Sequence, residues 1–83
     1  MPDMPTLGDV LAANIRAERA RRRWRQEDLA DLLGWPRSSV SDLESGKRRI
    51  VVDDLVPLCQ AFDVTFAKLL DGADEAELRT IGL

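Results

Sequence analysis

Two short amphipathic segments, residues 26–33 and 37–45, show the clearest pattern of apolar and polar positions in the chain. The apolar residues of the first segment recur at the spacing that places side chains on one face of an α-helix: Leu29, Ala30, Leu32 and Leu33. The second segment has only Val40 and Leu43 as large apolar residues, three positions apart. It should therefore pack along a narrow stripe and leave its polar side chains accessible.

The residues around these segments specify where each helix begins and ends. Gly34 and Gly46 follow the two segments, and glycine commonly ends a helix in the left-handed conformation. Pro36 fixes the backbone angle at the start of the second segment. Glu27 and Asp28 place negative charge in the first turn of the first segment, where the helix dipole favours it. The pattern predicts two helices joined by a tight turn.

The N-terminal part of the chain predicts one longer helix, from residue 7 to about residue 22. Thr6 and Asp9 have the spacing of a capping box, in which each side chain bonds to the other residue's backbone N–H. The apolar stripe of this helix consists of Leu7, Val10, Leu11 and Ile15. Residues 1–5 contain two prolines and are expected to form a flexible arm.

The C-terminal part predicts two more helices. Residues 50–52 are apolar and are expected to form an extended connector on the core, after which Asp53 and Asp54 start a helix. The buried stripe of that helix consists of Leu55, Leu58, Cys59 and Phe62. Thr65 caps a short helix over residues 66–70, which Gly72 closes. Residues 73–83 form an acidic tail or a short extra helix, so the main domain is expected over residues 6–72.

Composition narrows the class of protein. The 83 residues allow one small domain, and 45% of them are hydrophobic. There is no histidine, and Cys59 is the single cysteine, so neither an internal disulfide nor a His/Cys metal site is expected. With no assembled nucleophile, base or Gly-rich phosphate loop, we expect no enzyme activity, no cofactor and no small-molecule ligand. No segment has the pattern of a signal peptide or a membrane span, so a cytoplasmic protein is expected.

Charge is distributed unevenly along the chain. The formal net charge is −3, yet residues 15–50 hold ten Lys/Arg and six Asp/Glu, a balance of +4. The remaining residues have a balance of −7. At physiological salt, screening weakens the interaction of a phosphate group with protein charges more than about 8 Å away. The local charge balance therefore matters more than the net charge of the whole chain. The basic clusters flank the predicted helix pair, which favours a nucleic-acid partner over a merely solvated surface.

The helix pair resembles the helix-turn-helix of phage-repressor-type DNA-binding domains, the Cro/cI or Xre-like family. The residues that carry the resemblance are Gln26, Leu29, Ala30, Leu33, Gly34, Val40, Ser41, Leu43, Glu44, Gly46 and Lys47. With the flanking helices, the similarity covers nearly the whole chain. It implies an all-α fold, a compact five-helix lambda-repressor-like domain whose third helix is the recognition helix. The chain departs from the family pattern at Arg23, where Gly is frequent, and at Arg25 and Pro36, where Ser or Thr often caps a helix.

The recognition helix and its basic surroundings supply the candidate DNA contacts. Four side chains of the helix are the candidate base readers: Arg37, Ser38, Ser41 and Asp42. Asp42 can either accept from cytosine or pair with a nearby arginine. The candidate phosphate contacts are Gln26, Arg22, Arg23, Arg25, Ser39, Lys47, Arg48 and Arg49. For the charged members the alternative is plain solvation, and for Gln26 it is an exposed polar residue.

Other residues in this region are expected to be structural. Glu44 lies in the last turn of the recognition helix, where the dipole disfavours a carboxylate, so it needs a cationic partner. The family resemblance implies that Arg19 is this partner. Trp24 and Trp35 each precede an apolar residue, Leu29 and Val40, at the spacing of a hydrophobic staple. Both tryptophans are therefore interpreted as structural rather than base-stacking.

These features together predict a sequence-specific, double-stranded-DNA-binding transcription regulator, with repression as its expected mode. The resemblance implies a homodimer on an inverted-repeat operator, with a dimer interface drawn from Phe66, Leu69, Leu70, Leu78, Ile81 and Leu83. The alternative for the first three of these residues is that they only complete the core. The alternative function is an antitoxin-like module that uses the last helix and the acidic tail to bind another protein.

Overall fold

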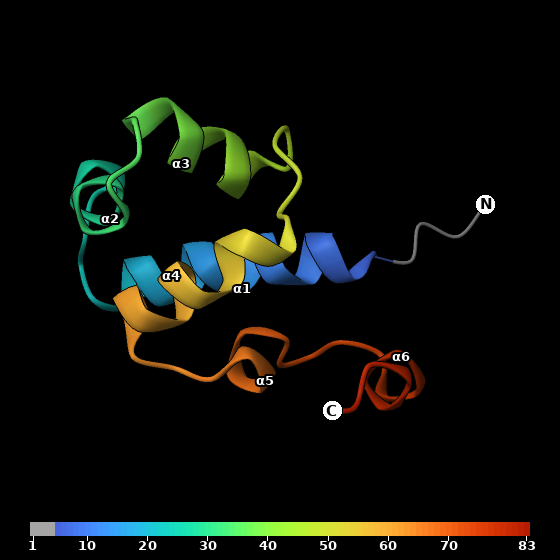
Figure 1. The fold of residues 1–83 in the computed structure, drawn as a ribbon. Helices are drawn as coiled ribbons and strands as arrows, with labels where there is room; N and C mark the ends of the chain where they lie inside the picture. The colour runs from blue at the N-terminus through green and yellow to red at the C-terminus, as the bar shows by residue number, and fades with distance from the viewer. Residues whose placement is uncertain (1–4) are drawn as a thin grey trace.

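The computed structural model describes residues 5–83, so all of the expected N-terminal arm except Pro5 lies outside the described residues. Within them the chain forms six helices and no strand. The helices are α1 (Leu7–Arg21), α2 (Gln26–Leu33), α3 (Arg37–Ser45), α4 (Val52–Phe62), α5 (Phe66–Leu69) and α6 (Glu75–Thr80). In Figure 1, α3 crosses the top of the molecule, α1 and α4 lie in the middle, and α5 and α6 lie at the bottom. The predicted all-α fold is confirmed, and the extra C-terminal helix is present.

Each of the first five helices contributes to a single core. Its fully buried side chains include Ile15 from α1, Leu29 from α2, Leu43 from α3, and Leu58 and Phe62 from α4. Leu69 from α5 also belongs to this core. Among residues 5–83, no helix is both long and apolar enough to cross a bilayer.

Local sequence signals set most helix boundaries as predicted. The Thr6 backbone N–H donates to Asp9, and the Asp9 backbone N–H donates to the Thr6 hydroxyl, both at 3.0 Å. Gly34 and Gly46 end α2 and α3 at φ values of 71° and 83°. The Thr65 hydroxyl accepts from the Lys68 N–H at 3.1 Å and caps α5. These bonds satisfy backbone groups that a helix end would otherwise leave unpaired.

The start of α4 differs from the prediction. The helix begins at Val52 rather than at Asp53, because Asp54 accepts the Val51 N–H at 3.1 Å and so fixes Val51 as the residue before the helix. Of the apolar connector, Ile50 packs against the core, but Val51 and Val52 are 53% and 79% exposed. The expectation that the connector tucks onto the core is therefore wrong for these two valines.

The expected dimer residues divide into two groups. Leu69 and Leu70 are only 0% and 1% exposed in the isolated chain, so their side chains complete its own core and have no surface to offer a second protomer. Phe66 and Leu78 are half-buried against the core, whereas Ile81 and Leu83 are about half exposed. We therefore remove Leu69 and Leu70 from the dimer surface.

The turn after α1 holds a residue in an unfavourable conformation. Arg23 has φ 59°, in the left-handed region, at the position where the resemblance leads one to expect glycine. The Arg23 N–H donates to the Ala20 carbonyl at 2.9 Å, and the Trp24 N–H donates to the Arg19 carbonyl at 3.1 Å. These two bonds close α1, so the backbone keeps the left-handed conformation although a side chain with a β-carbon disfavours it.

Arg23→Gly is expected to raise the free energy of unfolding by about 0.5–1 kcal/mol, because relief of the left-handed strain exceeds the extra entropy of glycine in the unfolded chain. Urea unfolding of both proteins measures the change. Arg21→Gly is the matched control, since Arg21 lies in α1 and glycine costs about 1 kcal/mol inside a helix. Equal losses in the two variants would contradict the prediction.

Candidate nucleic-acid interface

The turn between α2 and α3 presents one face of α3 to solvent. The Trp35 N–H donates to the Ala30 carbonyl at 3.0 Å, and this bond directs the chain from the end of α2 into α3. Val40, Leu43 and Glu44 form the buried side of α3. The remaining face is polar: Arg37, Ser38 and Asp42 are exposed, and Ser39 and Ser41 are half-buried. The four candidate base readers therefore belong to one helix and avoid its packing side.

Arg37 and Asp42 differ in their surroundings. Arg37 Nε lies 3.6 Å from Glu27 Oε1, and both side chains are at least half exposed, so this pair is weak. The Asp42 carboxylate forms no ion pair with an arginine among residues 5–83, which removes one of the two roles expected for it. Its backbone carbonyl accepts from the Arg48 N–H at 3.0 Å and from the Ser45 hydroxyl at 3.1 Å.

Glu44 fixes α3 to α1 and α2 and is only 5% exposed. The two carboxylate oxygens accept from Arg19 Nε at 2.6 Å and from Arg19 Nη2 at 3.0 Å, so the expected ion pair is present as a bidentate contact. Arg19 also donates to the Trp24 carbonyl at 2.7 Å, and Arg16 donates to the Glu44 carbonyl at 3.0 Å. The hydrogen bonds to Glu44 raise the pKa of Arg19 above its ordinary value, so Arg19 stays charged.

Gln26 opens α2, as predicted, but its side chain points to Glu44. The Gln26 amide donates to Glu44 Oε1 at 3.3 Å. A phosphate clamp by Gln26 remains a prediction, and it would require this amide to exchange its long bond to Glu44 for a bond to phosphate. The backbone N–H groups at the start of α2 could bind a phosphate group without any change in the Gln26 side chain.

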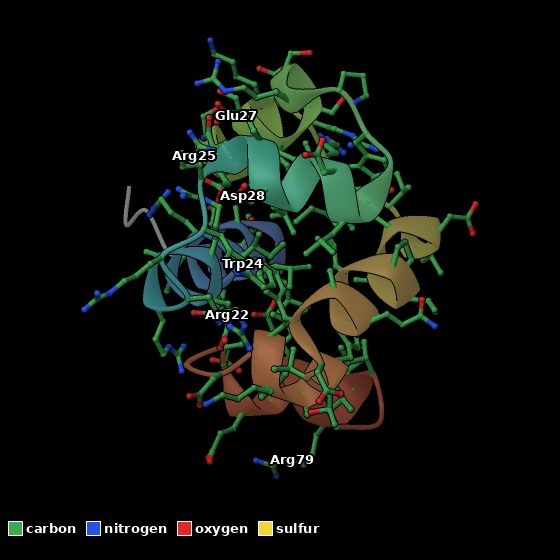
Figure 2. All side chains as sticks on the ribbon, turned by 90° about the vertical axis from the view of Figure 1, so that its left-hand side faces the viewer. Arg22, Trp24, Arg25, Glu27, Asp28 and Arg79 are labelled. Carbon is green, nitrogen blue, oxygen red and sulfur yellow. The ribbon has the colours of Figure 1, made fainter. Side chains whose placement is uncertain are left out.

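Arg22 lies inside a cluster of intramolecular contacts. It donates to the Glu18 carboxylate at 2.6 Å and to the Phe62 carbonyl at 2.7 Å. Its guanidinium lies over the rings of Trp24 and Phe62, at 5.6 and 5.1 Å. Figure 2 shows Arg22 close to Trp24, well below the Arg25 and Glu27 side chains that flank α2. These contacts assign Arg22 to the link between α1 and α4, so we do not include it among the proposed phosphate contacts.

Glu18 is expected to make stability depend on pH in the acid range. The hydrogen bond from Arg22 holds the pKa of this buried carboxyl below its ordinary value. A lowered folded-state pKa stabilises the protein above the unfolded-state pKa, and this contribution is lost as pH falls through the folded-state value. Thermal melts below about pH 4.3 should therefore show a smaller loss of stability in Glu18→Gln than in the parent protein. Parallel curves would contradict the assignment.

The other arginines near α2 remain accessible. Arg23 and Arg25 are both exposed. Arg25 Nε is 3.8 Å from Asp28, with the arginine side chain 76% exposed, so this contact leaves the charge available. The Arg25 N–H donates to the same carboxylate at 2.7 Å, which caps α2 from its third residue. Both arginines are therefore accessible to a phosphate group.

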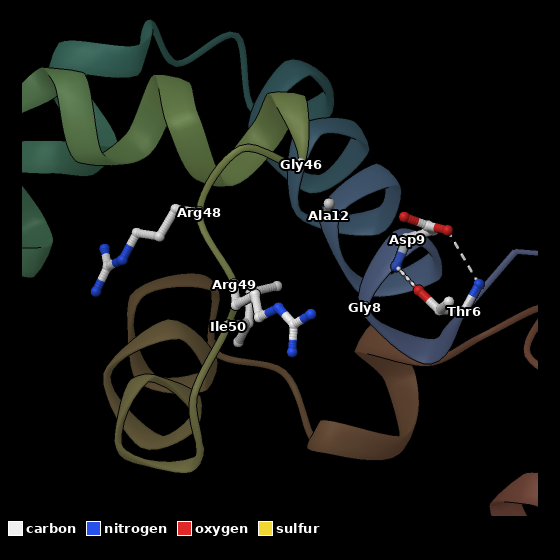
Figure 3. A pocket seen from close by; sticks show the side chains of 8 residues that line it. All are labelled: Thr6, Gly8, Asp9, Ala12, Gly46, Arg48, Arg49 and Ile50. Carbon is white, nitrogen blue, oxygen red and sulfur yellow. Dashed lines mark hydrogen bonds between the residues drawn. The ribbon is translucent and has the colours of Figure 1, made fainter.

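The loop after α3 separates its three cations. Lys47 and Arg49 are exposed, whereas Arg48 is half-buried. Arg48 Nη2 donates to Asp54 Oδ1 at 3.2 Å, and its guanidinium lies 4.3 Å from the centre of the Trp35 ring. Figure 3 shows Arg48 and Arg49 pointing away from each other, with Arg49 on the side of the start of α1. Arg48 thus joins the loop to α4 and to the α2–α3 turn, and the structure leaves Lys47 and Arg49 accessible.

Both tryptophans pack on the core, as expected. Trp24 stacks on Phe62 with ring centres 5.7 Å apart, and Trp35 lies beneath Arg48. Neither contact was evident in the chain, because the partners come from distant elements. Asp54 and Glu18, buried at 6% and 4% exposure, were also missed, since charged residues at helical spacing look the same whether exposed or buried. In residues 5–83, no three His, Cys, Asp or Glu side chains gather closely enough to bind a metal ion.

The α2–turn–α3 unit, its Arg19–Glu44 anchor and the exposed polar face of α3 have the arrangement of the helix-turn-helix class. Comparison with known sequences agrees with this class. Residues 10–79 match the family model described as a helix-turn-helix domain. The chain therefore belongs to the helix-turn-helix domain family, and the resemblance found in its sequence is confirmed.

Individual relatives carry regulatory names. The chain is 34% identical over 70 residues to a hypothetical transcription factor of Neisseria meningitidis serogroup B, covering 84% of this chain but just under two thirds, 66%, of that protein. It is 31% identical over 62 residues to control protein C.SmaI of Serratia marcescens, covering 75% of this chain and 74% of that protein.

Solved structures show the same arrangement of helices. The crystal structure of the hypothetical transcription factor NHTF from Neisseria aligns with a TM-score of 0.75 and 31% identity, over 98% of this chain and 91% of that one. The clp gene regulator ClgR from C. glutamicum aligns with a TM-score of 0.75 and 26% identity, over 84% of this chain and 90% of that one.

Proposed function

We propose that this protein is a transcription regulator that binds double-stranded DNA sequence-specifically as a homodimer. The observation that carries the proposal is the polar face of α3, which is left uncovered while the buried Glu44 fixes the opposite side of the helix to α1. A rigidly held helix with an uncovered polar face suits the major groove. The two copies of α3 would lie about 34 Å apart and read an inverted repeat.

The surroundings of α3 support contact with the DNA backbone. Four exposed cations lie in the segments before α2 and after α3: Arg23, Arg25, Lys47 and Arg49. They would contact phosphates, while Arg37, Ser38, Ser41 and Asp42 face the base edges. Ser39, which is half-buried at the start of α3, would donate a hydrogen bond from its short side chain to a DNA phosphate. The helix α6, which carries Glu75 and Glu77, lies at the end of the molecule opposite α3, with Arg79 far from the α2 side chains (Figures 1 and 2), so these two glutamates lie away from the proposed DNA face.

The names of the relatives agree with regulation of transcription, since one is named a hypothetical transcription factor, one a control protein and one a gene regulator. Selection of bound sequences from a random duplex pool, at two salt concentrations, tests the proposal. Enrichment of an inverted repeat with half-sites one helical turn apart is the expected result. Salt-sensitive retention without an enriched sequence would overturn sequence-specific regulation.

Lys47→Ala is expected to weaken binding to every DNA sequence by the same factor, because a phosphate contact carries no sequence information. The slope of log affinity against log salt should decrease in magnitude by about 1. Fluorescence anisotropy with the selected operator and a scrambled duplex measures both effects. Lys68→Ala, on α5 and away from α3, is the control and should change neither. A loss confined to the operator would contradict the phosphate role.

A further inference from the structure

We propose that Arg16 fixes the C-terminal end of α3 and thereby determines which base pairs the protein prefers. The inference rests on the proposed function, and it names a positioning residue that acts through Glu44 rather than by touching DNA. Arg16 belongs to α1, outside the α2–turn–α3 unit, so its place in the sequence does not assign it to base recognition.

Two arginines of α1 serve the C-terminal end of α3. The last turn of α3 has no basic residue of its own and carries Glu44 instead, although the helix dipole favours a cation there. Arg19 donates to the Glu44 carboxylate, and Arg16 Nη1 donates to the Glu44 backbone carbonyl at 3.0 Å. The two arginines are three residues apart and share one face of α1. One residue of α3 is therefore held from α1 both by its side chain and by its backbone.

No second donor duplicates the bond from Arg16. The carbonyls of the two residues before Glu44 accept from backbone N–H groups that follow α3, at 3.0 and 3.3 Å. Among residues 5–83, Arg16 is the only hydrogen-bond donor to the Glu44 carbonyl itself. Without a partner, a carbonyl at a helix end turns to water. Arg16 thus provides a link between the backbone of α3 and α1 that is lost when its guanidinium is removed.

An open cleft of about 180 Å³ lies between the end of α3 and α1. Ala12 and Ala13 line it from α1, and Ser45 and Gly46 line it from the end of α3. Figure 3 shows Gly46 near Ala12. Such small residues cannot interlock across the cleft as bulky apolar side chains do in a core. Packing would therefore not replace the bond from Arg16.

The base readers depend on how α3 is rotated about its own axis. Its buried stripe of Val40 and Leu43 is narrow, so it fixes the helix on the core but resists rotation only weakly. The bonds from α1 to Glu44 resist this rotation. Ser41 and Asp42 lie within one turn before Glu44, so a rotation directs them away from their base edges. A recognition site works only within about 0.5 Å and 10–20° of its productive geometry.

The proposed phosphate contacts do not depend on Arg16. Lys47 and Arg49 lie in the loop that Arg48 joins to α4 by its bond of 3.2 Å to Asp54. The other two proposed contacts precede α2. Loss of Arg16 should therefore weaken binding to the operator and leave binding to unrelated DNA unchanged, because phosphate contacts carry no sequence information.

Arg16→Met and Arg16→Lys form the matched pair that tests the inference. Arg, Lys and Met have similar helix propensities, but of the two variants only Arg16→Lys keeps a charged N–H donor. Arg16→Met should weaken operator binding about tenfold, as one mismatched base pair does, and leave binding to a scrambled duplex unchanged. Arg16→Lys should recover most of the operator affinity, since a single bond to a carbonyl does not require a planar guanidinium. Fluorescence anisotropy at two salt concentrations measures both affinities.

The same titrations contain the results that would overturn the inference. Equal losses on both duplexes, with a salt slope smaller by about 1, would show that Arg16 is a phosphate contact instead. Unchanged operator affinity of Arg16→Met, or no recovery in Arg16→Lys, would overturn it as well. Arg79→Met removes a cation far from the α2 side chains (Figure 2) and should change neither affinity. Both Arg16 variants should fold, because Arg16 is exposed, and thermal melts check this.

NMR spectroscopy without DNA tests the bond itself. The ¹³C shift of the Glu44 carbonyl and the ¹⁵N shift of the Ser45 amide respond to a hydrogen bond at that carbonyl. Both shifts should move in Arg16→Met and return towards the parent values in Arg16→Lys. The order parameters of the last turn of α3 should decrease in Arg16→Met, because this turn has lost a link to α1. Unmoved shifts and order parameters would overturn the inference.

The two proposals fail in distinguishable ways. Enrichment of an inverted repeat by the parent protein, together with an undiminished preference of Arg16→Met for that operator, would retain the proposed function and remove the role of Arg16. Absence of any enriched sequence would remove the proposed function and with it the effect of Arg16 on base preference. The NMR shifts would still decide whether Arg16 holds the end of α3.

Discussion

Replacing Glu44 with Ala is expected to lower the free energy of unfolding by about 3 kcal/mol and the melting temperature by roughly 12–24 °C. The carboxylate is almost fully buried, and it accepts two bonds from Arg19 and one from Gln26. Its removal leaves the Arg19 guanidinium, with only 17% of its side chain exposed, without its charged partner. The cost of that unpaired charge exceeds the worth of a typical surface ion pair.

A double-mutant cycle that combines Glu44→Ala with Arg19→Ala measures the coupling energy between the two side chains, apart from the stability that each single substitution removes. The double variant should be less destabilised than the sum of the two single variants, with a coupling energy above about 1 kcal/mol. Asp42→Ala is the matched control, because it removes an exposed carboxylate from the same helix and should change stability by less than about 0.5 kcal/mol. Additive losses in the cycle would show that Arg19 and Glu44 do not act as a pair.

Replacing Arg48 with Ala is expected to lower the free energy of unfolding by about 2 kcal/mol. The substitution removes the bond to Asp54, which is 6% exposed, and the contact of the guanidinium with the Trp35 ring. Asp54 keeps the N–H of Val51 but loses its cationic partner. Arg48→Lys should recover only part of the loss, because an ammonium group lacks the planar shape that stacks on an indole.

Chemical denaturation of Arg48→Ala and Lys47→Ala distinguishes the two neighbouring cations. Lys47 is exposed, so its variant should keep the parent stability within about 0.5 kcal/mol and lose only DNA affinity. Equal stability of both variants, with equal losses of DNA affinity, would return Arg48 to the role of a phosphate contact that the sequence suggested.

Much of the fold follows from signals that lie within a few residues of one another. Thr6 and Asp9, Gly34, Gly46 and Thr65 set helix boundaries through local bonds or local backbone angles. The start of α4 was misplaced by one residue because two adjacent aspartates could each cap it. In the structure Asp54 is the capping residue: it accepts hydrogen bonds from the Val51 N–H and from the Arg48 guanidinium.

The candidate interface was predicted less completely. The helix pair and its polar face were evident from spacing, as was the Arg19–Glu44 pair from the family resemblance. Which arginines remain accessible was not evident, because Arg22 and Arg48 are occupied by Glu18, Phe62, Trp35 and Asp54, which come from other parts of the chain. A run of cations in sequence does not reveal which members meet a buried carboxylate or an aromatic ring.

The sequence by itself determined the helices, the tight turn and the membership of the helix-turn-helix family, because periodicity, caps and glycine stops act over short distances. Only the tertiary structure decided that Leu69 and Leu70 complete the protomer's own core while Val52 and Val56 stay exposed. All four are aliphatic residues, and whether such a side chain is buried depends on the helices packed against its own segment.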